Sequence, residues 1–192
     1  MNEQTKNENE IVKPKMATQE IALIAVMTAV TCVLAPLSIP IGPVPVTFTN
    51  LAIYFGLYIL GMKREVISCA VYLLIGIAGV PVFSGLTGGP AKLMGPTGGY
   101  LLGFVPMAII AGFLIDKSDG KRVLSVIGMV LGTAICYALG TVWFCIQVDT
   151  TVVEALGLCV FPFLPGDGIK IAIATYFGPQ IQKMFHRLEL GL

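Results

Sequence analysis

The sequence predicts an all-α integral membrane protein with six transmembrane helices. Hydrophobic residues make up 56% of the 192 residues, charged residues only 12%, and the mean hydropathy is +0.87. Soluble domains are about 25% charged, so this chain has too few charged side chains to cover a water-exposed surface. Six apolar runs follow one another along the chain, and the basic residues gather between alternate runs. Composition, apolar runs and charge distribution thus all indicate a membrane protein with six spans.

The chain divides into a polar tail, residues 1–16, and a single six-helix membrane domain, residues 17–192. The tail lacks an apolar stretch at its start, which distinguishes it from a cleavable signal peptide. The last apolar run is about 27 Å long as a helix at 1.5 Å per residue, close to the thickness of the hydrocarbon layer. The predicted spans are residues 21–35, 46–62, 66–80, 100–115, 123–148 and 168–185.

Three less regular segments separate the spans on one side of the membrane. Residues 36–45 contain four prolines and no charge, which indicates an ordered loop. Residues 83–99 are rich in glycine and proline, and residues 149–165 are mixed, with room for a short helical turn.

The basic residues predict which side of the membrane each loop faces. Ten of the twelve Lys and Arg residues lie in the two terminal segments and in the loops after the second and fourth spans. Because cytoplasmic loops carry an excess of Lys and Arg, this face is assigned to the cytoplasm. Six spans then place both the N and C termini in the cytoplasm. The two exceptions are Lys92 and Lys170.

Lys170 would lie inside the sixth span, near its outer end. Asp167 precedes it by three residues, a spacing that puts both side chains on one helix face. An ionisable residue within a span is costly and is by default a functional candidate facing the protein interior. The structural alternative is that Asp167 caps the helix and pairs with Lys170.

Other polar or small residues fall on the same outer side. Together they predict a pocket with apolar walls, amide and hydroxyl groups, and one or two cations, suited to a small carboxylic acid with a polar ring. Each also has a plainer interpretation: a solvated loop charge, a helix-start hydrogen bond, a tight turn with small packing residues, or an interfacial tyrosine. These candidates are Thr47, Asn50, Lys92, Thr97, Gly98, Gly99 and Tyr100.

The motifs that are missing argue against enzymatic and nucleic-acid functions. The sequence has no HExxH, no GxSxG and no P-loop, so any ATP-driven transport would need energy from a partner. The five cysteines form no CxxC pair, and the only histidine, His186, lies in the polar C-terminal segment, so no metal site is expected. The charges are too few and scattered to bind nucleic acid.

One face of the first span consists of small residues. Ala22, Ala25, Ala29 and Cys32 recur at three- and four-residue spacing, which places them together on a helix. Small residues allow the backbones of two membrane helices to approach closely. The sequence therefore predicts a helix-packing face here.

The motifs of residues 88–104 and 165–170 resemble those of the BioY family, the biotin-specific S components of energy-coupling factor (ECF) transporters. The matching segments are Gly88-Gly89-Pro90, Gly95-Pro96-Thr97-Gly98-Gly99-Tyr100-Leu101-Leu102-Gly103-Phe104, and Pro165-Gly166-Asp167 with Lys170. The resemblance covers the chain after its tail in length, topology and motif order.

The resemblance implies a multi-pass protein of the prokaryotic cell membrane that captures biotin on the extracellular side. It further implies docking on a membrane-embedded T subunit driven by two ABC ATPase subunits. An AxxxA motif, here Ala25 to Ala29 with Ala22 on the same face, would provide the docking contact. No cofactor is implied.

Biotin fits the predicted pocket chemistry. Its ureido ring offers two N–H donors and one carbonyl, and Asp167 is a suitable acceptor for a ureido N–H. Lys170 or Lys92 would meet the carboxylate or the ureido oxygen, and the sequence does not decide which. Two alternatives stay open: an S component for another vitamin, expected to lack the 95–104 signature, and a non-transport membrane protein.

Overall fold

The computed structural model describes residues 18–40, 44–118 and 121–190, with side chains up to residue 185. Within these ranges the chain is mostly helical, as the sequence predicts. Its elements are α1 (Thr18–Leu34), β1 (Ser38–Ile39), β2 (Val46–Thr47), α2 (Thr49–Ile77), α3 (Pro90–Met94), α4 (Gly98–Asp116), α5 (Arg122–Val148), α6 (Val152–Cys159) and α7 (Leu164–Leu190).

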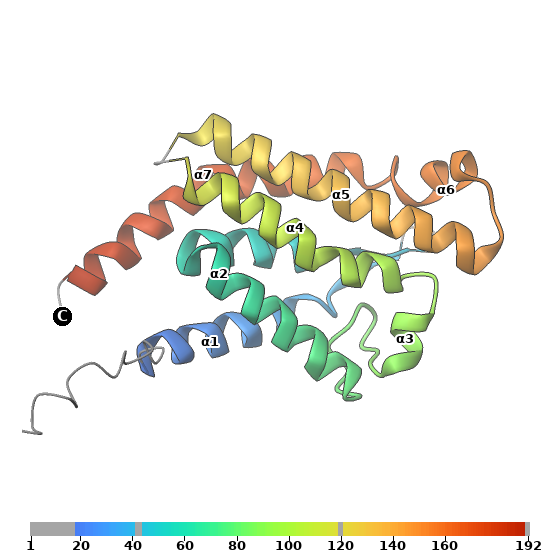
Figure 1. Ribbon diagram of the computed structural model, residues 1–192, viewed down its shortest axis with the longest axis horizontal. Coiled ribbons are helices and arrows are strands. Elements are labelled where there is room, and N and C mark those ends of the chain that lie inside the picture. The colour runs from blue at the N-terminus through green and yellow to red at the C-terminus, as the bar shows by residue number, and fades with distance from the viewer. Residues whose placement is uncertain (1–17, 41–43, 119–120, 191–192) are drawn as a thin grey trace, which may run out of the picture.

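The long helices lie side by side along one axis (Figure 1). At one end, on the right of Figure 1, lie α3, α6 and the connection that carries β1 and β2. At the other end lie the bend of α2, the turn between α4 and α5, the start of α1 and the end of α7. The basic residues Lys63, Arg64, Lys117 and Arg122 belong to the bend and turn at this second end.

The second helix is a hairpin of two arms. Gly61 has φ 75° and ψ 170°, outside the helical region, and it separates residues 49–60 from residues 62–77. A residue with a side chain adopts this conformation only with strain, so glycine suits the bend. Asp116 of α4 accepts a hydrogen bond from the amide of Met62 at 3.0 Å, which caps the second arm. The two arms correspond to the second and third predicted spans.

The helices differ in how well they fit a membrane. Among the described residues, α4 and α5 are each long and apolar enough to cross a bilayer, and α6 with α7, bent by 54°, could make a third crossing. Helix α1 is apolar but has only 17 residues. The helical fold and strongly apolar spans are therefore present, whereas the count of six spans stays a prediction.

Close contacts between α4 and α5 fix the position of Tyr100. A Cβ added at Gly140 would lie 2.3 Å from the Tyr100 ring, so the ring occupies the space that a side chain there would need. The core next to this contact contains Tyr54, Met107 and Phe144, all buried. Tight helix crossings through small residues are typical of membrane helices.

Two boundaries differ from those predicted. Helix α7 begins at Leu164, before the expected start at residue 168, so Asp167 lies within its first turn. The predicted second span begins with strand β2 instead of helix, and β2 pairs antiparallel with β1 of the proline-rich segment, so that Ser38 lies opposite Thr47. Propensity does not indicate this pairing because each strand has only two residues.

Candidate ligand-binding site

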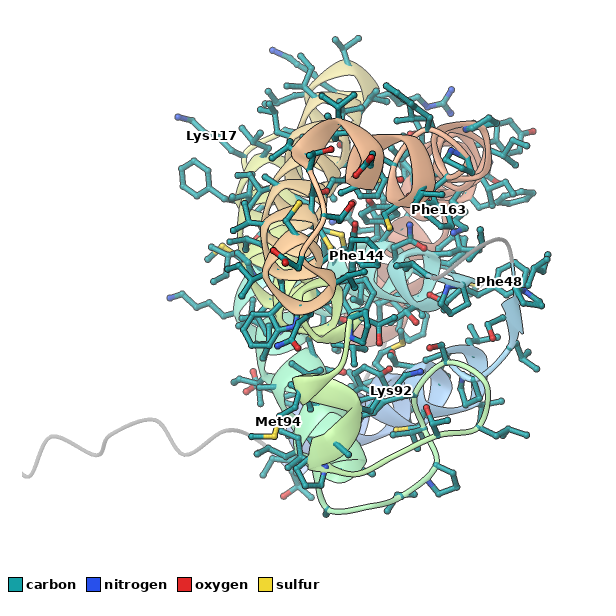
Figure 2. All side chains as sticks on the ribbon, turned by 90° about the vertical axis from the view of Figure 1, so that its right-hand side faces the viewer. Phe48, Lys92, Met94, Lys117, Phe144 and Phe163 are labelled. Atoms are coloured by element: carbon teal, nitrogen blue, oxygen red, sulfur yellow. The ribbon has the colours of Figure 1, made fainter. Side chains whose placement is uncertain are left out.

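A cavity lies among β2, the first arm of α2, α4, α5 and α7. It encloses about 490 Å³ of empty space, part of it open to the outside. Figure 2 shows the end of the molecule that carries α3 and α6, with Phe163 in the cavity wall. The cavity is lined by Val44, Pro45, Val46, Thr47, Asn50, Tyr100, Phe104, Met107, Thr133, Cys136, Tyr137, Cys159, Phe163, Asp167 and Lys170.

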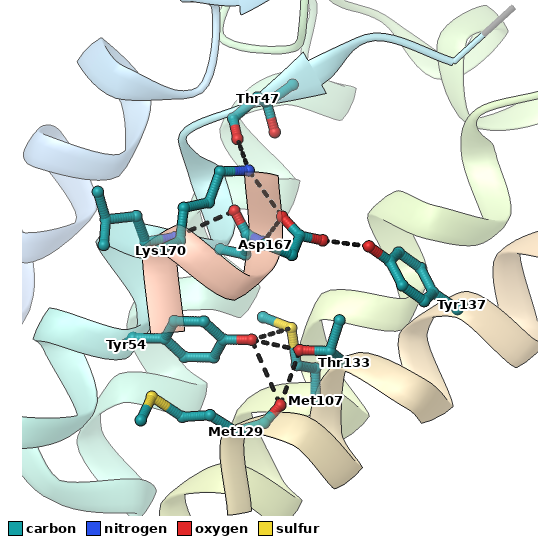
Figure 3. A network of polar contacts seen from close by, with 10 residues as sticks. Thr47, Tyr54, Met107, Met129, Thr133, Tyr137, Asp167 and Lys170 are labelled. Atoms are coloured by element: carbon teal, nitrogen blue, oxygen red, sulfur yellow. Dashed lines mark hydrogen bonds and ion pairs between the residues drawn. The ribbon is translucent and has the colours of Figure 1, made fainter. Parts of the chain in front are cut away.

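Asp167 is the centre of a polar network in this cavity (Figure 3). Its Oδ1 accepts hydrogen bonds from Asn50 Nδ2 at 2.7 Å and from Lys170 Nζ at 2.8 Å. Its Oδ2 accepts one from the hydroxyl of Tyr137. Three donors from α2, α5 and α7 therefore hold a carboxylate that is only 7% exposed. Charge-assisted hydrogen bonds of this kind are the stronger class.

Lys170 is buried with its partner. Besides the carboxylate, its Nζ donates to the backbone carbonyl of Thr47 at 2.7 Å, which ties α7 to β2. Only about a tenth of either side chain is exposed. Removing one member of a buried ion pair leaves the other as an uncompensated charge, which is strongly unfavourable.

A second polar cluster lies beside the Asp167 network, on the side of α5 (Figure 3). The Tyr54 hydroxyl bonds to Thr133 Oγ1, and Thr133 in turn donates to the carbonyl of Met129 at 2.7 Å. Thr133, Cys136 and Tyr137 follow at helical spacing, so one face of α5 supplies all three to the cavity. Apolar walls with a few converging polar groups are typical of small-molecule sites.

Comparisons with known proteins identify the family of this chain. Residues 4–187 match the BioY family. The chain belongs to the BioY family. It is 38% identical over 160 residues to biotin transporter BioY2 of Lactococcus lactis subsp. cremoris, covering 82% of this chain and 87% of that protein. It is 36% identical over 159 residues to biotin transporter BioY of Thermotoga maritima, covering 83% and 93%.

A solved structure has the same fold. The crystal structure of an S component for biotin from an ECF-type ABC transporter superposes with a TM-score of 0.80 at 28% sequence identity. The match covers 88% of this chain and 95% of the other. The fold of this BioY family member is therefore that of an ECF S component.

The predicted site residues separate into two groups. Asp167, Lys170, Asn50, Thr47 and Tyr100 all line the cavity, although Thr47 bonds to Lys170 through its backbone carbonyl. Thr97 lines a second cavity that adjoins the first.

The remaining three candidates are not in the lining of either cavity. A Cβ at Gly98 would lie 1.6 Å from the carbonyl oxygen of Leu93, and one at Gly99 would lie 2.2 Å from Trp143 Cβ. These two glycines permit close packing around the start of α4. Lys92 lies in α3, apart from Phe163 at this end of the molecule (Figure 2).

Sequence reasoning missed several lining residues, above all Tyr137. A tyrosine in an apolar span is not distinctive by itself. The sequence feature that could have indicated Tyr137 is Asp167, because a buried carboxylate requires hydrogen-bond donors from neighbouring helices. The other missed residues include Phe104, Met107, Thr133, Cys136 and Phe163.

The small face of α1 borders an apolar groove on the outside of the bundle. Ala22, Ala25 and Ala29 are exposed. Ala25 and Ala29 line the groove between α1 and the second arm of α2. The wall opposite is apolar and is supplied by Ile67, Val71 and Ile75.

Proposed function

We propose that this chain is the S component of an ECF transporter, and that it binds biotin in the cavity around Asp167. The observation that supports this most directly is the buried network of Asn50, Tyr137, Asp167 and Lys170 inside an apolar cavity of a BioY family protein. The similar solved structure is that of an S component for biotin from an ECF-type ABC transporter. The chain is thus a transporter subunit and not an enzyme.

The network suits the ureido ring of biotin. A carboxylate offers about four lone-pair directions, and three of those on Asp167 accept donors from the protein. The remaining direction can accept a ureido N–H, while the Lys170 ammonium or the Asn50 amide can donate to the ureido oxygen. Apolar side chains such as Phe104 and Met107 would cover the thiophane ring.

Binding of radiolabelled biotin to the purified chain in detergent tests this function. We expect saturable binding that unlabelled biotin displaces and that thiamine and riboflavin do not. Displacement by another vitamin in preference to biotin would favour an S component of different specificity. A chain that is folded by circular dichroism yet binds none of the three would contradict the proposed function.

The same proposal includes residues 17–192 as one membrane domain of six spans in the cell membrane. The spans are α1, the two arms of α2, α4, α5 and α7, with both termini in the cytoplasm. The grouping of basic loops at the end away from α3 and α6 supports this orientation (Figure 1). In a cysteine-free background, Leu86→Cys should react with an impermeant thiol reagent in intact cells, and Lys117→Cys should react only after permeabilisation. The reverse pattern would contradict the orientation.

We propose further that the T subunit of the transporter docks in the groove beside Ala25 and Ala29, with two ABC ATPase subunits completing the complex. Ala25→Trp or Ala29→Trp fills the groove and should abolish co-purification with the T subunit while leaving biotin binding intact. Val130→Trp is the control, because Val130 is an exposed apolar residue on α5. Co-purification of both alanine variants at the normal level would exclude this interface.

A further inference from the structure

Two grooves of similar size open on the surface of the bundle beside α5, and they differ in charge. The groove between α5 and α6 has about 760 Å³ of empty space, and its walls, which include Ala134 and Ala138, contain no charged side chain. The groove between α5 and α7 has about 730 Å³, and its wall contains the cation Arg122. The other residues of this wall carry no charge: Val126, Gly168, Ile171, Ala172, Thr175 and Tyr176.

The cation lies at one end of the α5–α7 groove. Helix α5 runs away from the end of the bundle that carries the basic loops, and α7 runs towards it (Figure 1). Arg122, the first residue of α5, and Tyr176 therefore line the end of the groove nearer to these loops. Gly168, close to the start of α7, lines the other end, where an added Cβ would meet no atom within 4 Å. The groove is thus polar towards the proposed cytoplasmic face and apolar and open further into the membrane.

The surroundings of Arg122 favour an anion. Its side chain is exposed, and it forms no ion pair within the part of the chain that the structure describes. Lys121 precedes it as the N-cap residue of α5, a helix of 27 residues, so the partial positive charge of the helix start adds to two full charges. A guanidinium matches the geometry of phosphate oxygens. Tyr176, which is 57% exposed, suits the level of lipid head groups.

An anionic phospholipid has the chemistry that this groove requires. Basic pockets between helices on the cytoplasmic side of membrane proteins bind anionic lipid head groups. The groove lies across the bundle from α1, so it still faces lipid if the T subunit docks beside α1 as proposed (Figure 1). We propose that one anionic phospholipid binds here, with its phosphate on Arg122 and an acyl chain along Ala172 and Gly168.

The charge is tested by native mass spectrometry of the full chain, released from micelles that contain phosphatidylglycerol or phosphatidylcholine with the same acyl chains. We expect the wild type to retain one phosphatidylglycerol and much less phosphatidylcholine. Arg122→Gln should lower the affinity for phosphatidylglycerol about five- to tenfold, because it removes one charge-assisted contact. Lys117→Gln is the matched control and should behave as wild type, because Lys117 is an exposed cation of the same turn that lines neither groove.

The path of the acyl chain is tested by filling each groove in turn. Ala172→Trp places a large side chain in the α5–α7 groove and should abolish retention of phosphatidylglycerol. Ala134→Trp is the control, because Ala134 is also an exposed alanine but lines the uncharged α5–α6 groove. Circular dichroism verifies that each variant keeps its helix content.

Four results would overturn the proposal. They are equal retention of the two lipids by the wild type, an unchanged affinity of Arg122→Gln for phosphatidylglycerol, equal losses in Arg122→Gln and Lys117→Gln, and equal losses in the two tryptophan variants. If Arg122→Gln keeps the lipid but no longer co-purifies with the T subunit, the groove binds protein and the proposal is also wrong. None of these measurements uses biotin, so their outcome is independent of the proposed function.

Discussion

Asp167 and Glu65 are both buried carboxyl groups, located towards opposite ends of the bundle, and their surroundings differ sharply. Asp167 accepts hydrogen bonds from Asn50, Tyr137 and Lys170. Glu65, four residues beyond the α2 bend at Gly61, is 0% exposed, and neither of its carboxyl oxygens has a partner among the described residues. Asp167 is therefore tied to α2 and α5 by its hydrogen bonds, whereas the Glu65 carboxyl group is buried without a partner among the described residues.

The different surroundings of the two carboxyl groups have an energetic consequence. A buried polar group without a hydrogen bond costs stability, and most of all when it is charged. A buried carboxylate with a full set of donors costs less, but it then depends on each of them. Replacing the Asp167 carboxyl group should therefore weaken ligand binding, whereas replacing the Glu65 carboxyl group should raise the stability of the fold.

The largest effect is expected for Asp167→Asn. The substitution leaves Lys170 buried without its counter-ion and replaces a charged acceptor with a neutral one. We expect biotin affinity to fall by about 2–4 kcal/mol, roughly 30- to 1000-fold, measured by titration calorimetry. Asp149→Asn is the control, because Asp149 is exposed and asparagine tolerates its left-handed conformation at φ 53°. Near-native affinity of Asp167→Asn would mean that the network is structural.

A smaller loss, of stability alone, is expected for Gly56→Ala. A Cβ at Gly56 would lie 2.0 Å from Oε2 of Glu65, so the buried carboxyl group must move. Overpacking of this kind costs about 1–3 kcal/mol, and each kcal/mol lowers the melting temperature by about 2–4 °C in a chain of this size. Adding Glu65→Ala to Gly56→Ala should recover part of the loss. A double variant that melts no higher than Gly56→Ala would show that the two side chains do not compete.

A modest gain is expected for Glu65→Met. Methionine has a similar length, is flexible enough to fit against Gly56, and buries no unpaired oxygen. Removing the unpaired carboxyl group should stabilise the fold by about 1 kcal/mol, which corresponds to a melting temperature higher by about 2–4 °C. Biotin affinity should not change, because Glu65 does not line the cavity around Asp167. A lower melting temperature would show that the native carboxyl group makes a stabilising interaction.

The same two residues show how far the sequence predicts the molecule. Asp167 stood out because an acidic residue beside Lys170 at a span boundary is conspicuous in a chain with so few charges. Glu65 follows Lys63 and Arg64 directly, and a short charged cluster between two apolar runs is typical of a solvated loop. The bend occurs earlier, at Gly61, and the second arm then carries Glu65 into the interior.

The long apolar runs predict the positions of the long helices well, because the length and composition of a span are local properties of the sequence. The predicted fifth span, residues 123–148, corresponds closely to α5. Contacts between helices are harder to predict from the sequence. Tyr137 contacts Asp167 only because α5 and α7 pack side by side. The glycines of residues 95–99 indicated close approach correctly, but Gly98 and Gly99 approach neighbouring protein segments. A motif alone does not say whether ligand or protein fills the space next to a glycine.

The smallest effect is expected at a third carboxylate, Glu20, which completes the comparison. It pairs with Arg64 and thereby joins α1 to the bend of α2. About a third of each side chain is exposed: 38% for Arg64 and 29% for Glu20. Water screens such a pair and competes for its donors, so its net contribution is small.

We therefore expect Glu20→Gln to lower the stability by less than about 1 kcal/mol, which is less than the effects expected for Asp167→Asn, Gly56→Ala and Glu65→Met. The loss should shrink further as salt is added, because exposed charges are screened while buried ones are largely protected. Melting curves of Glu20→Gln and wild type at low and high ionic strength measure this directly. A large, salt-independent loss would mean that the pair is shielded from water, and that Glu20 resembles Asp167 more than its exposure indicates.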